Sequence, residues 1–126
     1  MTPETVQRRR SRMVRAGTGK LMAAEAATFA VASAVHFANG FTDAAIPELV
    51  IAVVLGTGSW TVLAKRANAW GIAIGTTAFA TFGTIVGLSI IATGRQDWPD
   101  LTYHASILTA LVITLIALIR PVALER

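Results

Sequence analysis

Residues 69–92, AWGIAIGTTAFATFGTIVGLSIIA, contain no charged side chain, and this stretch decides the fold. An α-helix needs about 20 consecutive apolar residues to cross the hydrocarbon core of a bilayer, which is roughly 30 Å thick. Three further stretches of similar length and composition occur at 21–38, 46–64 and 101–119. The sequence therefore predicts an all-α membrane protein built as a bundle of four transmembrane helices.

The distribution of charge argues against a water-soluble bundle. Only 14% of the residues are charged and 54% are hydrophobic, whereas about 25% of the residues in soluble domains are charged. Residues 49–64, 67–93 and 101–119 carry no charge when histidine is counted as neutral. Within 21–38, the only charged residue is Glu25. A soluble helix needs a polar stripe along one face, so the lipid bilayer is the predicted surrounding medium.

The pattern divides the chain into three segments. Residues 1–20 form a basic N-terminal segment, 21–119 form the transmembrane domain, and 120–126 form a short tail. Ten of the eleven basic residues lie in the two terminal segments or at 65–66, and only Arg95 lies in another connection. Basic residues are enriched on the cytoplasmic side of membrane proteins. We therefore expect a multi-pass protein of the cell membrane with both termini in the cytoplasm.

The basic N-terminal segment admits three interpretations. Its arginines can anchor the chain to anionic lipid headgroups, which is the interpretation we favour. Together with the first apolar stretch and Ala32-Ser33-Ala34, the segment also resembles a cleavable secretory signal. A nucleic-acid-binding arm is the least favoured, and no nucleic acid is expected as a partner. The excess of arginine over lysine, with abundant alanine and glycine, points to a bacterial cytoplasmic membrane.

Small residues predict where helices approach one another. Gly71-xxx-Gly75 and Gly83-xxx-Gly87 place two glycine pairs on the third span, among several threonines. In lipid, helices associate through close backbone contact and hydrogen bonds rather than through the hydrophobic effect. We expect this span at the centre of the bundle or in a homo-oligomer contact.

Local signals predict the helix ends at the outer side. Asp43 is expected to cap the second helix, with Pro47 in the first turn, where no N–H donor is required. Gly94 is expected to end the third helix. Asp97-Trp98-Pro99-Asp100 is expected to begin the fourth, with acids near the positive end of the helix dipole.

Polar residues are expected to gather at the outer end of the bundle: His36, Asp43, Glu48, Asp97, Asp100, Tyr103 and His104. Two histidines with carboxylates could bind a divalent metal ion, ligate a haem through His36 and His104, or form a proton relay. The alternative is structural: the aspartates are caps or loop acids, Tyr103 is an interfacial aromatic, and His104 lies near water. His36 and Glu48 fit that alternative less well, because each lies about one turn inside its span.

Glu25 is the most distinctive candidate for a functional residue, because inserting a carboxylate within a membrane span costs about 3 kcal/mol of free energy. One interpretation is a proton-binding site that serves transport. The other places Glu25 near the inner interface, paired with Lys20 or Lys65.

Three functions are compatible with these features. We favour a non-catalytic accessory, assembly or scaffold subunit that acts through helix contacts with itself or with a membrane partner. A proton-coupled transporter or channel subunit using Glu25 is the second. A redox protein that binds metal or haem through His36 and His104 is the third. No nucleophile–base set or phosphate-binding motif is present, and the sequence by itself requires no cofactor.

Overall fold

The computed structural model describes residues 1–94 and 98–124, with side chains described as far as residue 120. These ranges form four helices: α1 (Pro3–Ala38), α2 (Thr42–Leu63), α3 (Ala69–Thr93) and α4 (Trp98–Leu124). Each helix is long and apolar enough to cross a membrane. The prediction of an all-α chain with four candidate transmembrane helices is therefore confirmed.

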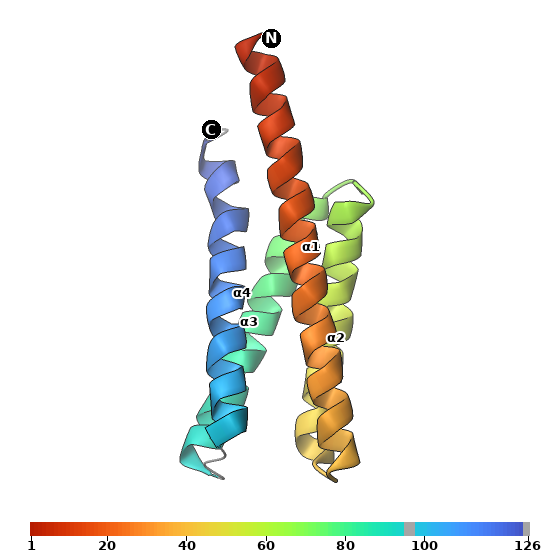
Figure 1. Cartoon of the computed structure of the whole chain (residues 1–126), viewed down its shortest axis with the longest axis vertical. Helices are drawn as coiled ribbons and strands as arrows, with labels where there is room; N and C mark the ends of the chain where they lie inside the picture. The colour runs from red at the N-terminus through yellow and green to blue at the C-terminus, as the bar shows by residue number, and fades with distance from the viewer. Residues whose placement is uncertain (95–97, 125–126) are drawn as a thin grey trace.

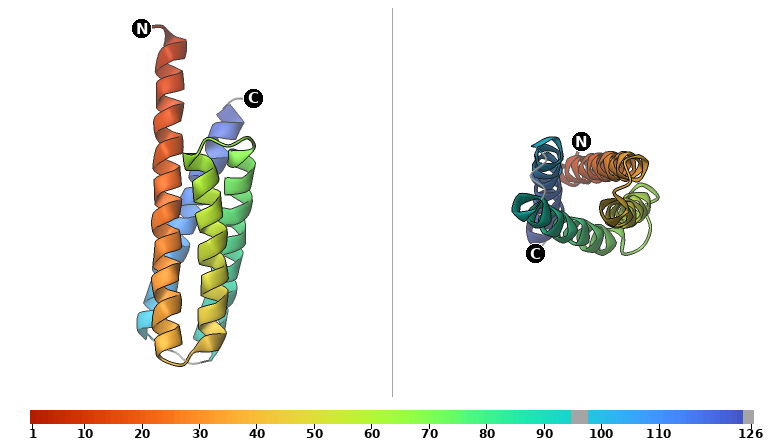
Figure 2. Two further views of the ribbon diagram at one scale, coloured as in Figure 1. Left: turned by 90° about the vertical axis from the view of Figure 1, so that its right-hand side faces the viewer. Right: turned by 90° about the horizontal axis from the view of Figure 1, so that it is seen from below.

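The helices alternate in direction and follow one another around a ring (Figure 2). Consecutive helices pack side by side, and α1 also contacts α4, which closes the ring. The start of α1 and the end of α4 lie at one end of the bundle, and the connection between α1 and α2 lies at the other (Figure 1). We call these the terminal end and the far end. α3 packs against α2 and α4 as one member of this ring, and its expected role in a homo-oligomer contact stays a prediction.

α1 begins far earlier than the first apolar stretch. Its N-cap is Thr2, whose side chain accepts a hydrogen bond from the backbone N–H of Thr5, and Pro3 and Glu4 occupy the first turn. All of these are favourable at a helix start. A helix of 36 residues is about 54 Å long. Its first turns therefore project beyond the other helices and carry the basic segment with them (Figure 1).

The start of α2 differs from the prediction. The helix begins at Thr42, and no side chain caps it by a hydrogen bond, so the capping role predicted for Asp43 is wrong. Asp43 instead lies in the first turn, where its charge still complements the helix dipole. Pro47 lies one turn deeper than expected, inside the helix. Pro47 has no N–H to donate to the carbonyl group four residues earlier in the helix. Because Pro47 is exposed, this unpaired carbonyl lies on the outer surface.

The end of α3 and the start of α4 agree with the sequence. α3 ends at Thr93 and is followed by Gly94, and α4 begins at Trp98 with Pro99 and Asp100 in its first turn. Asp97 lies outside the described residues.

Buried side chains and interhelical hydrogen bonds hold the ring together. The largest buried apolar side chains are Met22, Phe29, Leu55, Leu111 and Leu118. Three bonds at 2.7 Å join neighbouring helices: Ser33 Oγ to the Ala45 carbonyl, Ser59 Oγ to the Gly19 carbonyl, and Trp70 Nε1 to the Leu118 carbonyl. In lipid such bonds contribute about 0.6 kcal/mol each and at most about 1.7 kcal/mol.

The two glycine pairs of α3 have different surroundings. A Cβ at Gly83 would lie 3.0 Å from the Ile51 side chain of α2, and one at Gly87 would lie 3.4 Å from a ring atom of α4. Nothing lies within 4 Å of a Cβ placed at Gly71 or Gly75. The second pair therefore lies close to side chains of neighbouring helices, and the first pair has no such neighbour within 4 Å.

Candidate functional site

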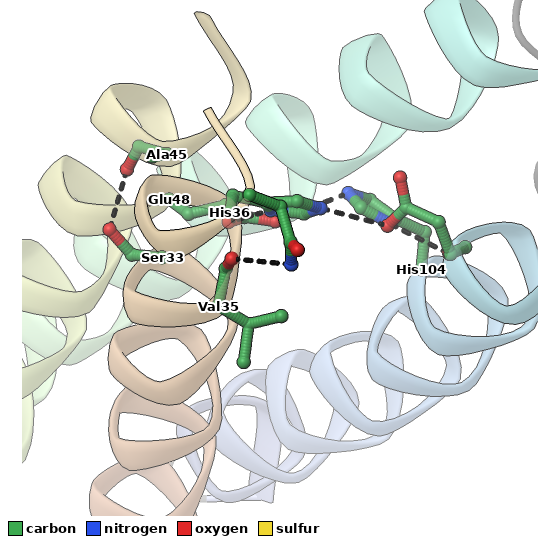
Figure 3. Close-up of polar contacts among 8 residues, drawn as sticks. Ser33, Val35, His36, Ala45, Glu48 and His104 are labelled. Atoms are coloured by element: carbon green, nitrogen blue, oxygen red, sulfur yellow. Dashed lines mark hydrogen bonds and ion pairs between the residues drawn. The ribbon is translucent and has the colours of Figure 1, made fainter. Parts of the chain in front are cut away.

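The far end of the bundle brings two histidines and two carboxylates together. His36 comes from the last turn of α1, and Glu48 comes from the second turn of α2. The short connection makes these helices antiparallel neighbours, which places the two side chains at matching depth. Asp100 and His104 lie four residues apart near the start of α4, so they share one helix face. In Figure 3, the side chains of His36, Glu48 and His104 point toward one another.

Distances within this cluster are those of direct contact. His36 Nδ1 lies 2.6 Å from Glu48 Oε2, and His36 Nε2 lies 3.7 Å from Asp100 Oδ1. His104 Nδ1 lies 3.1 Å from the same Asp100 oxygen, and His104 Nε2 lies 3.9 Å from Glu48 Oε1. One ligand atom from each of His36, Glu48 and Asp100 fits within a mutual separation of 4.8 Å. We call these four residues the His–carboxylate cluster.

Hydrogen bonds select the tautomer of each ring. Nδ1 of His104 also lies 2.9 Å from the Asp100 backbone carbonyl, an acceptor that only an N–H can satisfy. When Glu48 is a carboxylate, it likewise accepts a hydrogen bond from Nδ1 of His36. With both Nδ1 atoms protonated, each neutral ring keeps a lone pair on Nε2. Ligating histidines are held by the same kind of bond from the second ring nitrogen to a carboxylate or carbonyl.

These bonds leave one remaining acceptor atom on each residue: His36 Nε2, His104 Nε2, Asp100 Oδ1 and Glu48 Oε1. Nε2 of His36 lies near the Asp100 oxygen, and Nε2 of His104 lies near the Glu48 oxygen. Glu48 is only 4% exposed, and its Oε1 has no hydrogen-bond donor among the described residues. An unpaired buried acceptor costs about 1–3 kcal/mol, and more when it is charged. A positive species beside this oxygen would remove that cost, and His36, Glu48 and Asp100 have ligand atoms close enough to hold one ion.

The negative charge of the cluster also favours a bound positive species. Within residues 1–94 and 98–120, neither Glu48 nor Asp100 pairs with a lysine or arginine, and their recorded partners are the two histidines. Two carboxylates in a low-dielectric region need compensation. A divalent cation bound by neutral histidines would balance them, and two imidazolium groups would do the same.

The remaining residues expected at this end fare differently. Tyr103 packs edge-on against His104, with ring centroids 5.3 Å apart, and its buried hydroxyl has no partner among the described residues. His104 is 6% exposed, so its side chain is buried inside the bundle. Asp43 is exposed on the first turn of α2 and belongs to no recorded ion pair of the described residues.

Glu25 is separate from the cluster, about 16 Å along α1 from His36 by helix rise. It is 3% exposed, and its Oε1 lies 2.5 Å from Thr114 Oγ1 on α4. No ion pair joins it to Lys20 or Lys65 in the part of the chain that is described, and both lysines are exposed. The lysine pairing suggested by the sequence does not form. Sequence reasoning had no signal for Thr114, because hydroxyls are common in these spans.

A hydrogen count describes the state of Glu25. Besides its contact with Glu25, Thr114 Oγ1 lies 2.9 Å from the Ala110 carbonyl. A hydroxyl has one hydrogen and can donate to only one of these acceptors. If Thr114 donates to Ala110, the carboxyl group of Glu25 must carry the proton of the other bond. The neutral acid thus satisfies both contacts, whereas a carboxylate satisfies one.

Comparison with known proteins identifies no relative. No protein-family model, curated protein or solved structure matches the chain. The functional argument therefore depends on the geometry of the His–carboxylate cluster.

Proposed function

We propose that this protein is a membrane-embedded metalloprotein whose His–carboxylate cluster binds one divalent transition-metal ion. The observation that carries the proposal is the buried Glu48 Oε1, which lacks a donor and faces the lone pair of His104 Nε2 at 3.9 Å. Two acceptors at that separation repel unless a positive species lies between them.

The spacing of these atoms is close to that required by such an ion. Ligands of a tetrahedral ion bound at about 2.0–2.1 Å lie about 3.3 Å apart. Two pairs of cluster atoms lie 3.7 and 3.9 Å apart, so ion binding requires only a small inward shift of the side chains. Mixed imidazole and carboxylate donors favour Zn²⁺, Fe²⁺ or Mn²⁺ over the soft ions that thiolates select. Such an ion would act as a Lewis acid toward an oxygen-bearing substrate.

A haem fits the same residues less well. Its two axial ligands must face each other across a porphyrin plane. Here Asp100 Oδ1 contacts nitrogens of both rings, at 3.7 Å on His36 and 3.1 Å on His104. The carboxylates would have to leave the space between the rings, so a bare ion is favoured.

Metal binding is tested by titrating the apo protein with Zn²⁺ and Co²⁺ in phosphatidylcholine nanodiscs. We expect one ion per chain, with visible Co²⁺ bands typical of four-coordination. His36→Ala should abolish stoichiometric binding. Asp43→Asn, which removes an acid at the same end but outside the cluster, should not. Equal binding by both variants, or no binding by the wild type, would refute the proposal.

We also propose that both termini face the cytoplasm, in a bacterial cytoplasmic membrane, with the cluster toward the opposite side. Support comes from the ten basic residues grouped near the terminal end and from the high arginine content. Two tryptophans near that end contact arginines: Arg15 lies 5.5 Å from the ring centroid of Trp70, and Arg66 lies 4.9 Å from that of Trp60. The chain lacks cysteine, so Thr2→Cys and Asp43→Cys can be labelled separately in intact cells. Only the second should react with an impermeant maleimide.

Two other functions remain predictions. The open faces of Gly71 and Gly75 favour a contact with another helix, as a scaffold subunit or homo-oligomer would require. The buried, singly partnered Glu25 favours a proton-binding step in transport. A pull-down from native membranes tests the first, and proton flux in proteoliposomes containing Glu25→Gln tests the second.

A further inference from the structure

A cavity of about 600 Å³ lies between α1 and α4, where the two helices diverge (Figure 1). Its wall on α1 includes Ala27, Val31 and Val35. Val31 is 65% exposed, so this wall is accessible from the surface that faces lipid in a membrane. The cavity volume is within the range of about 300–1,000 Å³ that holds one small ligand.

One end of the cavity is polar and reaches the His–carboxylate cluster. His36 and Asp100 line the cavity and also belong to the cluster. Tyr103 lines the same end of the cavity, although its hydroxyl is buried. A ligand in the cavity would therefore meet a metal ion at one end and mostly aliphatic side chains along the rest.

The lining of the cavity favours an amphiphilic chain over a second protein helix. From Ala27 to Val35 the wall of α1 rises about 12 Å. Most side chains along this wall are aliphatic, and His36 and Asp100 lie at one end. A hydrocarbon chain matches the aliphatic wall, an anionic headgroup matches the end that would hold a cation, and the bilayer supplies hydrocarbon chains at high concentration.

We propose that this cavity binds a single-chain amphiphile from the bilayer. Its anionic oxygen headgroup would coordinate the metal ion. Its hydrocarbon chain would lie along Ala27, Val31 and Val35. The inference rests on the proposed metal site, because the metal ion supplies the positive charge that selects an anionic headgroup.

Photocrosslinking of the whole chain in phosphatidylcholine nanodiscs loaded with Zn²⁺ tests this. The probes are palmitate and hexadecyl phosphate, each with a diazirine in the chain, and hexadecanol with the same group is the uncharged control. We expect saturable labelling of the α1 wall by an anionic probe, and competition by its unlabelled form. The two anionic probes distinguish a carboxylate from a phosphate headgroup.

Val31→Trp fills the cavity, and Val53→Trp is its matched control, since Val53 is a 61% exposed valine on α2 that does not line the cavity. Val31→Trp should reduce saturable labelling about tenfold, equivalent to one decade in affinity, and leave Zn²⁺ stoichiometry unchanged. Val53→Trp should change neither. Ala27→Phe, a smaller obstruction, provides a second variant if Val31→Trp unfolds.

The outcomes separate this inference from the metal site. Zn²⁺ binding without saturable labelling, or equal labelling by hexadecanol, overturns the amphiphile and leaves the metal site intact. Labelling that persists unchanged when Zn²⁺ does not bind overturns the metal-anchored headgroup together with the proposed function. Loss of a dimer in Val31→Trp, measured by light scattering without any labelling of the wild type, would assign the cavity to a second copy.

Discussion

Glu25 and Glu48 are two glutamates with the same burial and different surroundings. Glu25 is 3% exposed and Glu48 is 4% exposed. Around Glu25 the recorded polar contact is one hydroxyl, from Thr114. Glu48 instead contacts both histidines within 3.9 Å, and Asp100 lies in the same cluster. Burial alone does not assign a role to an intramembrane acid, because the neighbouring donors and acceptors decide whether it holds a proton or a cation.

Position along the bundle accounts for the difference. Glu48 lies near the ends of α1, α2 and α4, where polar residues that begin and end helices are available as neighbours. Glu25 lies in the middle of α1. The only polar residues of α4 between 105 and 119 are Ser106, Thr109 and Thr114. A neutral acid bonded to a hydroxyl is the state that this apolar region tolerates best.

The largest effect on Zn²⁺ binding is expected when Glu48, but not Glu25, is replaced by its amide. Glu48→Gln removes a negative ligand and should weaken Zn²⁺ binding by more than about 100-fold, since even changes next to the ligands cost 10–100-fold. Glu25→Gln should leave binding unchanged. Isothermal titration in nanodiscs measures both, and equal losses in the two variants would erase the distinction between the acids.

A second test concerns the close packing of helices around Gly58 in the middle of the bundle. Gly58→Ala would place a methyl group against the Thr76 side chain and 2.9 Å from Met22 Cε, so we expect a loss of about 1–3 kcal/mol from overpacking. Gly56→Ala, two residues away with nothing within 4 Å of its Cβ, is the matched control. Unfolding in mixed micelles gives both values. A stable Gly58→Ala protein would show that α1, α2 and α3 are not in tight contact there.

The bond between Glu25 and Thr114 should have a smaller effect. A double-mutant cycle with Glu25→Leu and Thr114→Val should give a coupling energy of about 0.6 kcal/mol and at most about 1.7 kcal/mol. The same cycle with Thr109→Val, an exposed threonine on α4, should give none. Absence of coupling at Thr114 would mean that Glu25 has another partner.

The smallest effect is expected for Tyr103→Phe. Its hydroxyl has no partner among the described residues, so removal should leave the free energy of unfolding unchanged or raise it by up to about 1 kcal/mol. Trp70→Phe at the terminal end loses a 2.7 Å bond to Leu118 and should be destabilising. A large loss of stability in Tyr103→Phe would show that the phenol is bonded in the apo protein.

Much of the fold followed from composition and local signals. Long uncharged stretches specify helices that cross a bilayer, because lipid offers no partner for backbone N–H and C=O groups. Gly94 and Pro99 indicated helix ends, because glycine is favoured just after a helix and proline in the first turn of one. The helical state of the basic segment was missed, because a helix that is already formed extends easily through arginine-rich sequence once Thr2 and Pro3 cap it.

The sequence predicted which residues lie near the site, but it did not predict which of their side chains contact one another. Sequence placed His36, Glu48, Asp100, Tyr103 and His104 at one end of the bundle, because the periodic spans fix the depth of each residue. It did not exclude Asp43, because depth leaves the rotation of each helix undetermined.

The sequence by itself determined that this chain is four apolar helices with its acids and histidines at set depths, since hydrophobic length and charge are properties of each segment alone. Only the tertiary structure decided which helix faces meet. That choice depends on side-chain fit between segments distant in sequence, such as His104 against Gly87 and Thr114 against Glu25. The same fit turned one buried glutamate toward two imidazoles and the other toward a single hydroxyl.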